Sequence, residues 1–261
     1  MKRTKISASP ESFPRELFEI FRDADIYDSS CSPEARVYYI NKDNGYYLKM
    51  SAKGSLNAEA VLTEYFNSKN IGTKVLKYLS LDKDWLLTEK VCGEDCTHGI
   101  YLENPKKLCD ITAGLLRQLH ELDFTDCPVQ NHSERYINTV ISNYKTGNYD
   151  KTAFPDSFGY KNAEEAFLVV EKYKNNLKSD TLLHGDYCLP NIMLDNWKFS
   201  KFIDLGNGGV GDRHVDVFWG IWTLFFNLKT NEYASRFIDA YGRDKIDTDM
   251  LRFIAACEVF G

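Results

Sequence analysis

The stretch from residue 182 to residue 216 constrains this chain more than any other part of its sequence. It places Asp186 after a His-Gly pair, Asn191 five residues later, and Asp204 in front of a Leu-Gly pair. Two short apolar runs between Asn191 and Asp204 predict two strands. Aspartate and asparagine also favour turns, so each residue alone says little. Their order along alternating polar and apolar segments indicates one polar site built around a pair of strands.

The segments before this stretch predict a small antiparallel sheet that carries one helix. Two apolar runs flank an Asn-Gly pair, which is a strong hairpin signal. A helical pattern and two more strand-like runs follow. The predicted strands are Val37–Ile40, Tyr46–Met50, Val75–Leu79 and Trp85–Thr88, and the helix is Ser55–Asn67. Ahead of them, Pro10–Arg22 predicts a helix and Asp23–Pro33 a polar loop.

Beyond residue 92 the pattern becomes mainly helical. Apolar residues recur at helical spacing in several segments. The expected helices are Pro105–Leu122, His132–Tyr144, Asn162–Lys174, Val215–Asn227, Glu232–Tyr241 and Asp247–Val259. The change of pattern predicts two domains, residues 1–92 and residues 93–261. The expected fold class is α+β, with a small β-rich N-terminal lobe and a larger, mainly helical C-terminal lobe.

Composition argues against several classes of function. The 261 residues carry a formal net charge of −6, whereas nucleic-acid binders usually present a basic surface. No apolar run reaches the roughly 18 residues of a membrane span, and no apolar run follows the basic start as in a signal peptide. The seven cysteines are an odd number, which indicates thiols in a reducing compartment. We therefore expect a cytoplasmic protein with neither a nucleic-acid nor a membrane partner.

The polar residues match the parts that phosphoryl transfer needs. One carboxylate orients the attacking hydroxyl, oxygen ligands hold Mg²⁺ against the phosphates, and a cation positions the phosphates of ATP or GTP. Asp186 suits the first role, and Asn191 and Asp204 suit the second, at the spacing of a kinase catalytic loop. Lys49 on a predicted strand and Glu59 on the next predicted helix suit the third role as an ion pair.

Two features separate the chain from protein kinases. No Gly-x-Gly-x-x-Gly loop lies between the first strands. The segment Ser30–Pro33 precedes the strand at Val37 instead, and Ser32 is the candidate phosphate contact there. Few residues separate Asp204 from the helix predicted at Val215, which leaves no room for a peptide-docking segment. A small molecule is therefore expected as the phosphoryl acceptor.

These stretches resemble the aminoglycoside phosphotransferase family, most closely its 3'-phosphotransferase (kanamycin kinase) branch. The resemblance covers nearly the whole chain. The matching segments are Tyr47–Met50, the helix holding Glu59, Leu116–His120, His184–Met193, Phe202–Gly206 and the ending Glu258–Phe260. The resemblance implies a protein-kinase-like two-lobed fold with a nucleotide cleft. It also implies that the γ-phosphate of a nucleoside triphosphate is transferred to an aminoglycoside hydroxyl, which gives antibiotic resistance.

The resemblance further implies roles for single residues. Asp186 resembles the catalytic aspartate, Asn191 and Asp204 the magnesium ligands, and Lys49 with Glu59 the phosphate-positioning pair. The hinge whose backbone meets the adenine corresponds to Thr88, Glu89, Lys90 and Val91. Glu258 and the terminal region at Phe260 would bind the ammonium groups of the substrate.

The acceptor side of the expected site depends on carboxylates. An aminoglycoside is a polycation, and it needs several weak, solvent-exposed ion pairs that act together. The loop 147–160 offers Asp150 and Asp156. Asn207 follows the Asp-Leu-Gly triplet, where the family often has arginine, and is a third candidate for acceptor binding.

Two alternative functions stay open at this point. One is a kinase of the same fold that acts on another small hydroxylated metabolite, such as an amino sugar or a choline-like alcohol. The other is a nucleotide-binding module without catalysis.

Overall fold

A computed structural model describes residues 3–7, 12–31, 35–150 and 159–261. The chain divides into two compact units. The sheet unit comprises residues 1–95 and 190–207, and the helical unit comprises residues 96–189 and 208–261. The expected domain division after residue 92 stays a prediction. In the structure, residues 190–207 return to the sheet unit because β9 (Ile192–Asp195) pairs with β7 (Glu94–Asp95).

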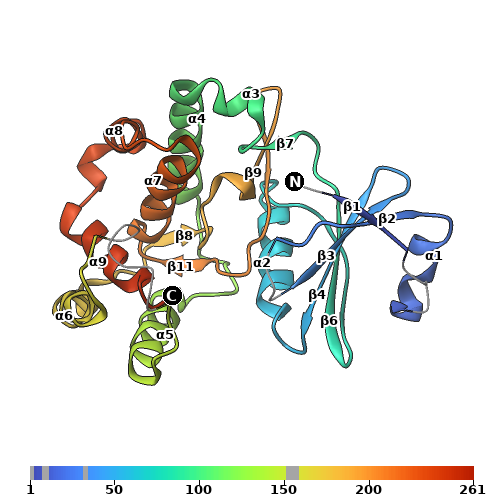
Figure 1. Ribbon diagram of the computed structural model, residues 1–261, viewed down its shortest axis with the longest axis horizontal. Helices are drawn as coiled ribbons and strands as arrows, with labels where there is room; N and C mark the ends of the chain where they lie inside the picture. Colours follow the sequence, from blue (N-terminus) through green and yellow to red (C-terminus); the bar gives the residue numbers. More distant parts are fainter. Residues whose placement is uncertain (1–2, 8–11, 32–34, 151–158) are drawn as a thin grey trace. The chain divides into compact units, whose positions relative to one another are not determined.

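The sheet unit is built on an antiparallel sheet of six strands in the order β1-β2-β3-β4-β6-β5 (Figure 1). The strands are β1 Thr4–Ile6, β2 Asp25–Asp28, β3 Arg36–Asn41, β4 Tyr46–Ala52, β5 Val75–Ser80 and β6 Lys83–Glu89. Helix α2 (Asn57–Ser68) packs on β5 and β6 through a small cluster that contains Leu56, Ala60 and Leu86. The second sheet of this unit joins β10 (Lys198–Phe202), β9 and β7. The predicted hairpin, helix and strands of this region are confirmed.

The start of the sheet unit differs from the prediction. Within the span expected as one helix, the structure has a 3₁₀ turn, Arg15–Leu17, and a short helix α1, Phe18–Phe21. Pro14 is extended, and it also restricts the backbone of the residue before it, so the helix cannot begin earlier. The apolar spacing instead serves packing, since Phe13 and Phe21 stack in the core at 3.9 Å between ring centroids. The expected polar loop also contains β2, which pairs with β1 on one side and β3 on the other.

The helical unit contains most of the helices and a two-stranded sheet (Figure 1). Its helices are α3 Gly99–Leu102, α4 Pro105–His120, α5 His132–Thr146, α6 Ala163–Tyr173, α7 His214–Leu228, α8 Ala234–Tyr241 and α9 Thr248–Glu258. Strands β8 (Thr181–Leu183) and β11 (Gly209–Gly211) pair antiparallel. The main core of this unit joins α5, α6, α7 and α9 and includes Val170, Phe253 and Phe260. The predicted helices are confirmed, with small changes at their ends.

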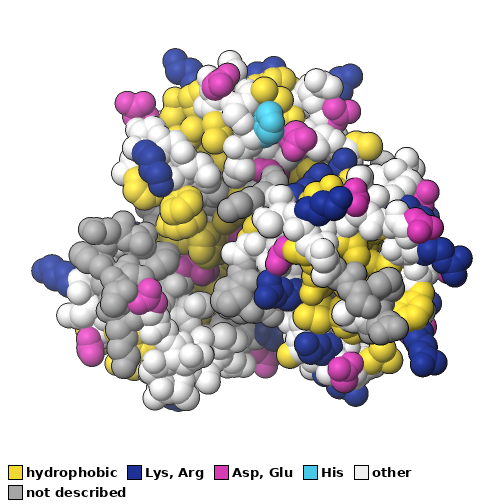
Figure 2. All heavy atoms as spheres, turned by 45° about the vertical axis from the view of Figure 1, so that its right-hand side comes forward, with side chains coloured by type: hydrophobic (Ala, Val, Ile, Leu, Met, Phe, Trp, Pro, Cys, Tyr) yellow, Lys and Arg dark blue, Asp and Glu magenta, His cyan; other side chains and the backbone are white. Residues whose placement is uncertain are grey.

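The surface and the helices carry two further observations. On the face drawn in Figure 2, lysine and arginine side chains are interspersed with aspartate and glutamate. Across the described ranges, every helix falls short of the length and apolar character needed to cross a membrane.

Candidate active site

Three charged side chains meet in the sheet unit. Lys49 lies in β4, where the register pairs it with Leu86 of β6, and Glu59 lies in the first turn of α2. The Nζ atom of Lys49 donates to Oε2 of Glu59 and to Oδ1 of Asp204, at 2.7 Å in both cases. The lysine and the glutamate are mostly buried, whereas half of the Asp204 side chain is exposed. The predicted pair therefore forms, and it includes the aspartate as a third member.

The electrostatics of this trio keep the lysine charged. Burial by itself lowers the pKa of Lys49, but the charges and hydrogen bonds of Asp204 and Glu59 outweigh burial and raise it. Burial raises the pKa of Glu59, because the Lys49 ammonium offsets only part of the desolvation and the Asp204 charge adds to it. Lys49 is thus a fixed cation whose direction is set by two carboxylates.

The two candidate metal ligands lie at one end of the β9–β10 hairpin. Asn191 directly precedes β9, and one residue separates Asp204 from the end of β10. The amide of Ile203 donates to the carbonyl of Asn191 at 3.1 Å, which extends the ladder to this end. Asp204 has a φ of 59°, in the left-handed region that a non-glycine residue adopts at a cost. An amide oxygen and a carboxylate are oxygen donors of the kind that Mg²⁺ prefers.

The face of the sheet that carries Lys49 is also aromatic. Side chains alternate along a strand, so Tyr47 points to the same face as Lys49. Tyr39 lies opposite Tyr47 in the register, with 5.3 Å between their ring centroids. The guanidinium of Arg3 lies 3.8 Å from the Tyr39 ring centroid and donates to the Tyr47 hydroxyl at 2.7 Å. The sequence reasoning missed this platform, although the period of two in Tyr47-Leu48-Lys49 could have indicated it.

The expected hinge lies at and beyond the end of β6. Thr88 and Glu89 are its last two residues, and Val91 is buried just after them. The amide of Lys90 donates to the carbonyl of Gly45 at 3.0 Å, and the carbonyl of Glu89 accepts from Thr73 Oγ1 at 2.8 Å. These bonds hold the segment in place, and its contact with adenine stays a prediction.

Two of the expected site residues fall in segments that the structure does not describe. Ser32 and Asp156 lie outside the described residues.

The loop that carries Asp186 belongs to the helical unit and follows β8. Asp216, in the first turn of α7, holds this loop through hydrogen bonds to its backbone. The carboxylate of Asp216 accepts from the amides of His184 and Gly185 at 2.7 and 2.8 Å. The amide of Asp186 in turn donates to Nδ1 of His184 at 3.3 Å. The Asp186 side chain is partly exposed, so it can meet a ligand.

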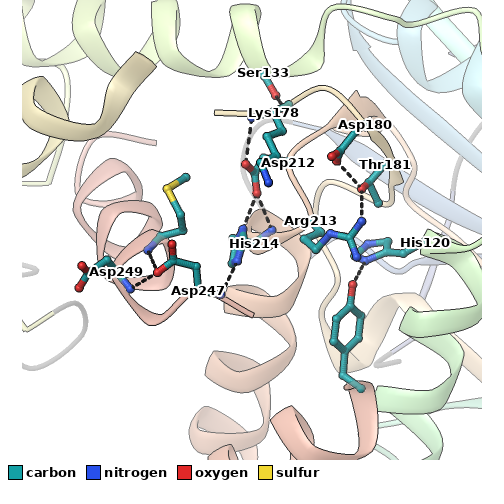
Figure 3. Close-up of polar contacts among 12 residues, drawn as sticks. His120, Ser133, Lys178, Asp180, Thr181, Asp212, Arg213, His214, Asp247 and Asp249 are labelled. Atoms are coloured by element: carbon teal, nitrogen blue, oxygen red, sulfur yellow. Dashed lines mark hydrogen bonds and ion pairs between the residues drawn. The ribbon is translucent and has the colours of Figure 1, made fainter. Parts of the chain in front are cut away.

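A buried histidine completes this support. Nε2 of His120 lies 3.1 Å from Asp216, and Nδ1 lies 2.8 Å from the hydroxyl of Tyr241, a contact drawn in Figure 3. Burial lowers the pKa of His120, so the ring is neutral at neutral pH; it donates to the carboxylate and accepts from the tyrosine. Burial would raise the pKa of Asp216, but the hydrogen bond from His120 and the backbone donors lower it. Asp216 is thus an ionised, fully paired anchor.

The candidate acceptor residue Glu258 ends helix α9. It accepts a hydrogen bond from the Tyr136 hydroxyl at 2.7 Å and another from the indole of Trp219. Burial raises its pKa from 4.5 to about 7, and the nearby charge of Asp186 adds to the rise. The Asp186 and Glu258 carboxylates therefore act on each other within one unit. Two repelling carboxylates form a site that a cation would stabilise.

The other acceptor candidates differ in their surroundings. The Phe260 ring is fully buried and packs edge-on against Tyr144 and Phe167, so its side chain belongs to the core. Its carbonyl accepts from the Asn143 side chain at 2.7 Å. Asp150 and Asn207 are exposed.

A polar chain fixes the start of α9 (Figure 3). Nδ1 of His214 lies 2.6 Å from Asp212, and Nε2 accepts from the amide of Asp247 at 3.0 Å. The Asp247 carboxylate caps α9 by accepting from the amides of Asp249 and Met250. The helix that carries Glu258 is thereby tied to the start of α7.

Fold and site together define a class of protein. A strand lysine held by a helix glutamate and by an aspartate before glycine is how kinase-like enzymes position nucleotide phosphates. The chain is thus a kinase-like phosphotransferase. The sequence model of the phosphotransferase enzyme family matches residues 33–254, and the chain belongs to that family.

Individual relatives agree with this assignment. A probable aminoglycoside 3'-phosphotransferase of Lactococcus lactis is 52% identical over 252 residues, which cover 96% of each protein. An aminoglycoside 3'-phosphotransferase of Niallia circulans is 26% identical over 98% of this chain and 100% of that protein. The resemblance inferred from the motifs is confirmed.

Solved structures show the same fold. The aminoglycoside 3'-phosphotransferase of type VIII gives a TM-score of 0.76 at 21% identity, and the match covers 95% of this chain and 100% of that one. An aminoglycoside phosphotransferase from Streptomyces rimosus, in complex with ADP and streptomycin, gives 0.72 at 22% identity over 86% and 90%. The expected kinase-like α+β fold is confirmed.

Proposed function

We propose that this enzyme transfers the γ-phosphate of a nucleoside triphosphate to the 3'-hydroxyl of an aminoglycoside antibiotic and thereby gives resistance. The observation that carries the proposal is that the charge of Asp186, the phosphoryl-transfer aspartate, acts on Glu258, a partly buried carboxylate that has hydrogen-bond donors but no cation beside it among the described residues. Membership in the family and the 52% identity with the Lactococcus lactis protein support the acceptor class. None of the seven cysteines forms a disulfide, which supports a place in the cytoplasm.

The sheet unit supplies the donor side. Lys49, kept charged and aimed by Glu59, contacts the phosphates of ATP or GTP. The Tyr47 ring offers a stacking surface to the base, and the backbone from Thr88 to Val91 offers amides and carbonyls to its edge. Ser32, which lies outside the described residues, is a further candidate for contact with the phosphates. Relatives of the same fold bind ADP, which agrees with a nucleotide donor.

The oxygen donors at the end of the β9–β10 hairpin fit a magnesium ion. Asn191 and Asp204 would hold it together with phosphate oxygens and water, because Mg²⁺ seldom takes a cage made by protein alone. When bound, the ion neutralises charge that builds up on the phosphates. Asp204 is the better placed of the two, since half of its side chain is exposed and its left-handed backbone keeps it at the strand end.

The helical unit supplies the acceptor side. Asp186 accepts the hydrogen bond of the substrate hydroxyl and takes its proton as the new oxygen–phosphorus bond forms and the bond to the nucleoside diphosphate breaks. Asp216, with His120 behind it, keeps the loop from shifting during this step. Glu258 binds a substrate ammonium group, and the exposed Asp150 adds a polar contact. Asp156, which lies outside the described residues, is a further candidate for acceptor binding. Phe260 contributes to acceptor binding through its backbone, because its ring is buried.

Steady-state kinetics with purified enzyme test the proposal. Nucleotide consumption should depend on kanamycin or neomycin, and Asp186→Asn should lower kcat by about 10²- to 10⁴-fold. The matched control is Asp195→Asn, an exposed aspartate at the end of β9, which should leave kcat unchanged. Full activity of Asp186→Asn would refute the catalytic assignment. If glucosamine or choline were phosphorylated and aminoglycosides were not, the acceptor class would be wrong while the kinase assignment stood.

A further inference from the structure

Helix α7 carries a row of aromatic side chains that nothing in the phosphoryl-transfer scheme uses. Trp219, Trp222 and Phe226 follow one another at spacings of three and four residues, so they lie along one side of the helix. The Trp219 and Trp222 rings meet edge to face at 5.3 Å, and the Trp222 and Phe226 rings stack at 4.9 Å. The row is continuous over about 10 Å of helix axis.

The exposure of this row is greatest at its C-terminal end. Trp219 packs partly against the main core of the helical unit, and Trp222 is half-buried. Phe226 is 50% exposed, and it is the one aromatic among the exposed large hydrophobic side chains of the described residues. An exposed phenylalanine stacked on a tryptophan offers a ligand an apolar surface whose burial is favourable.

The Trp219 end of the row lies at the candidate acceptor site. The indole of Trp219 donates a hydrogen bond to Glu258, the carboxylate that also accepts from Tyr136. Trp219 therefore touches the residue that we assign to the substrate ammonium. The row leads away from that carboxylate.

Helix α7 is also the element that holds the catalytic loop. Asp216 accepts from the loop amides at His184 and Gly185, and Thr223 Oγ1 accepts from the amide of Leu189 at 3.1 Å. One helix thus fixes both the loop that bears Asp186 and the aromatic row. Helix α7 therefore sets the distance between the substrate hydroxyl at Asp186 and the aromatic row. A site that selects its substrate needs such a fixed distance.

We propose that Trp219, Trp222 and Phe226 form a stacking wall that binds the rings of the aminoglycoside beyond the ring that is phosphorylated. This inference rests on the proposed function and names residues that determine its specificity. Aromatic faces suit such a ligand because they attract ammonium groups and cover the apolar face of a sugar ring. Carboxylates at one end and aromatic faces along the side complement a polycation without any basic residue in the wall itself.

The far end of the wall already holds an ammonium group. Nζ of Lys229 lies 4.2 Å from the centroid of the Phe226 ring. The geometry of a cation over this ring is therefore realised within the chain. Lys229 also places a positive charge where a polycationic ligand would arrive, so it opposes binding at this end. Its removal should favour the ligand, whereas removal of Phe226 should weaken it.

Kinetic constants for a multi-ring aminoglycoside such as neomycin test the wall. Phe226→Ala and Trp222→Leu should each raise KM by about three- to tenfold with little change in kcat, from the size of a cation–π or stacking contact. Phe226→Tyr should keep the wild-type KM. Lys229→Gln should lower KM by about two- to threefold. The matched control is Leu168→Ala on α6, a 72% exposed side chain, which should change nothing.

Two readouts separate the possible failures. Quenching of tryptophan fluorescence by neomycin, without nucleotide, reports binding independently of turnover and should weaken in Phe226→Ala. If wild type is active but both aromatic variants keep its KM and quenching, the wall is refuted and the proposed function stands. If wild type neither binds nor phosphorylates any aminoglycoside, both are overturned. Glucosamine adds a check, because a single ring reacting at Asp186 should not sense Phe226; a loss of equal size for glucosamine would refute the wall.

Discussion

Two glutamates that lie wholly or partly inside this enzyme have opposite electrostatic surroundings. Glu59 in the sheet unit has a lysine partner at 2.7 Å, so its charge is balanced inside the protein. Among the described residues, Glu258 in the helical unit has a tyrosine hydroxyl and an indole as partners, which donate hydrogen bonds but carry no charge. The donor side is thus an internal ion pair that aims a cation. On the acceptor side, the described residues leave the negative charge of Glu258 without a cation, and an incoming polycation would neutralise it.

The largest effect on activity is expected from removing the ion pair between Lys49 and Glu59. Lys49→Met should lower kcat by about 10²- to 10³-fold, the range for loss of one group that stabilises the transition state. The same change leaves Glu59 buried without a cation, so the free energy of unfolding should fall by roughly 3 kcal/mol. Adding Glu59→Gln should restore part of the stability but none of the activity. Urea unfolding and steady-state kinetics measure the two effects.

A control separates the pair from general effects on the sheet. Lys83→Met at the exposed start of β6 removes a lysine of the same sheet and should leave kcat and stability near wild type. If Lys49→Met and the double variant were equally stable, Glu59 would not depend on its partner, and the contrast with Glu258 would disappear.

The second effect concerns the charge of Glu258 on the acceptor side. Glu258→Gln keeps the shape and the hydrogen bond from Tyr136 but removes the charge. The KM for kanamycin should rise by about tenfold, the cost of one lost charged contact at a partly buried site, while KM for the nucleotide stays unchanged. In wild type, KM for kanamycin should fall as the pH rises through about 7, because Glu258 ionises there. A pH dependence that survives in Glu258→Gln would assign it to another group.

The site residues that the sequence predicted were recognisable because they lie in local motifs. Lys49, Asp186, Asn191 and Asp204 lie in short motifs whose spacing reflects the strands and turns that carry them. The supports of Asp186 have no such motif. Asp216 is 32 residues from the amide of His184 and 96 residues from His120, so only the tertiary fold brings these partners together.

The parts of the fold that were predicted wrongly also depend on contacts distant in sequence. Helical spacing of Phe13, Leu17 and Phe21 arose from packing in a common core, which a period of apolar residues alone does not distinguish from a long helix. Strand β2 was not predicted because it begins and ends with an aspartate. The first of these, Asp25, forms an ion pair with Lys5 at 2.7 Å. Its partner on one side is the short β1, so its place is set by a pairing distant in sequence.

A third effect concerns stability rather than activity. The folded protein raises the pKa of Glu258 from 4.5 to about 7, so between these values it holds a proton that the unfolded chain has lost. The resulting stabilisation is complete below pH 4.5 and disappears as the pH rises through 7. Glu258→Gln should therefore unfold at a higher temperature than wild type at pH 8, and the advantage should shrink at pH 5. A variant less stable than wild type at pH 8 would show that Glu258 is balanced after all.

The smallest effect tests how the unbalanced carboxylate is held. Asp247 caps α9 and donates its amide to His214, eleven residues before Glu258. Asp247→Ala removes the side-chain cap but keeps the amide, so the free energy of unfolding should fall by about 1 kcal/mol. If α9 transmits the position of its start to Glu258, KM for kanamycin should rise by about twofold, and Asp247→Asn should restore both values. A loss of stability with an unchanged KM would show that Tyr136 and Trp219 place the carboxylate without help from the helix start.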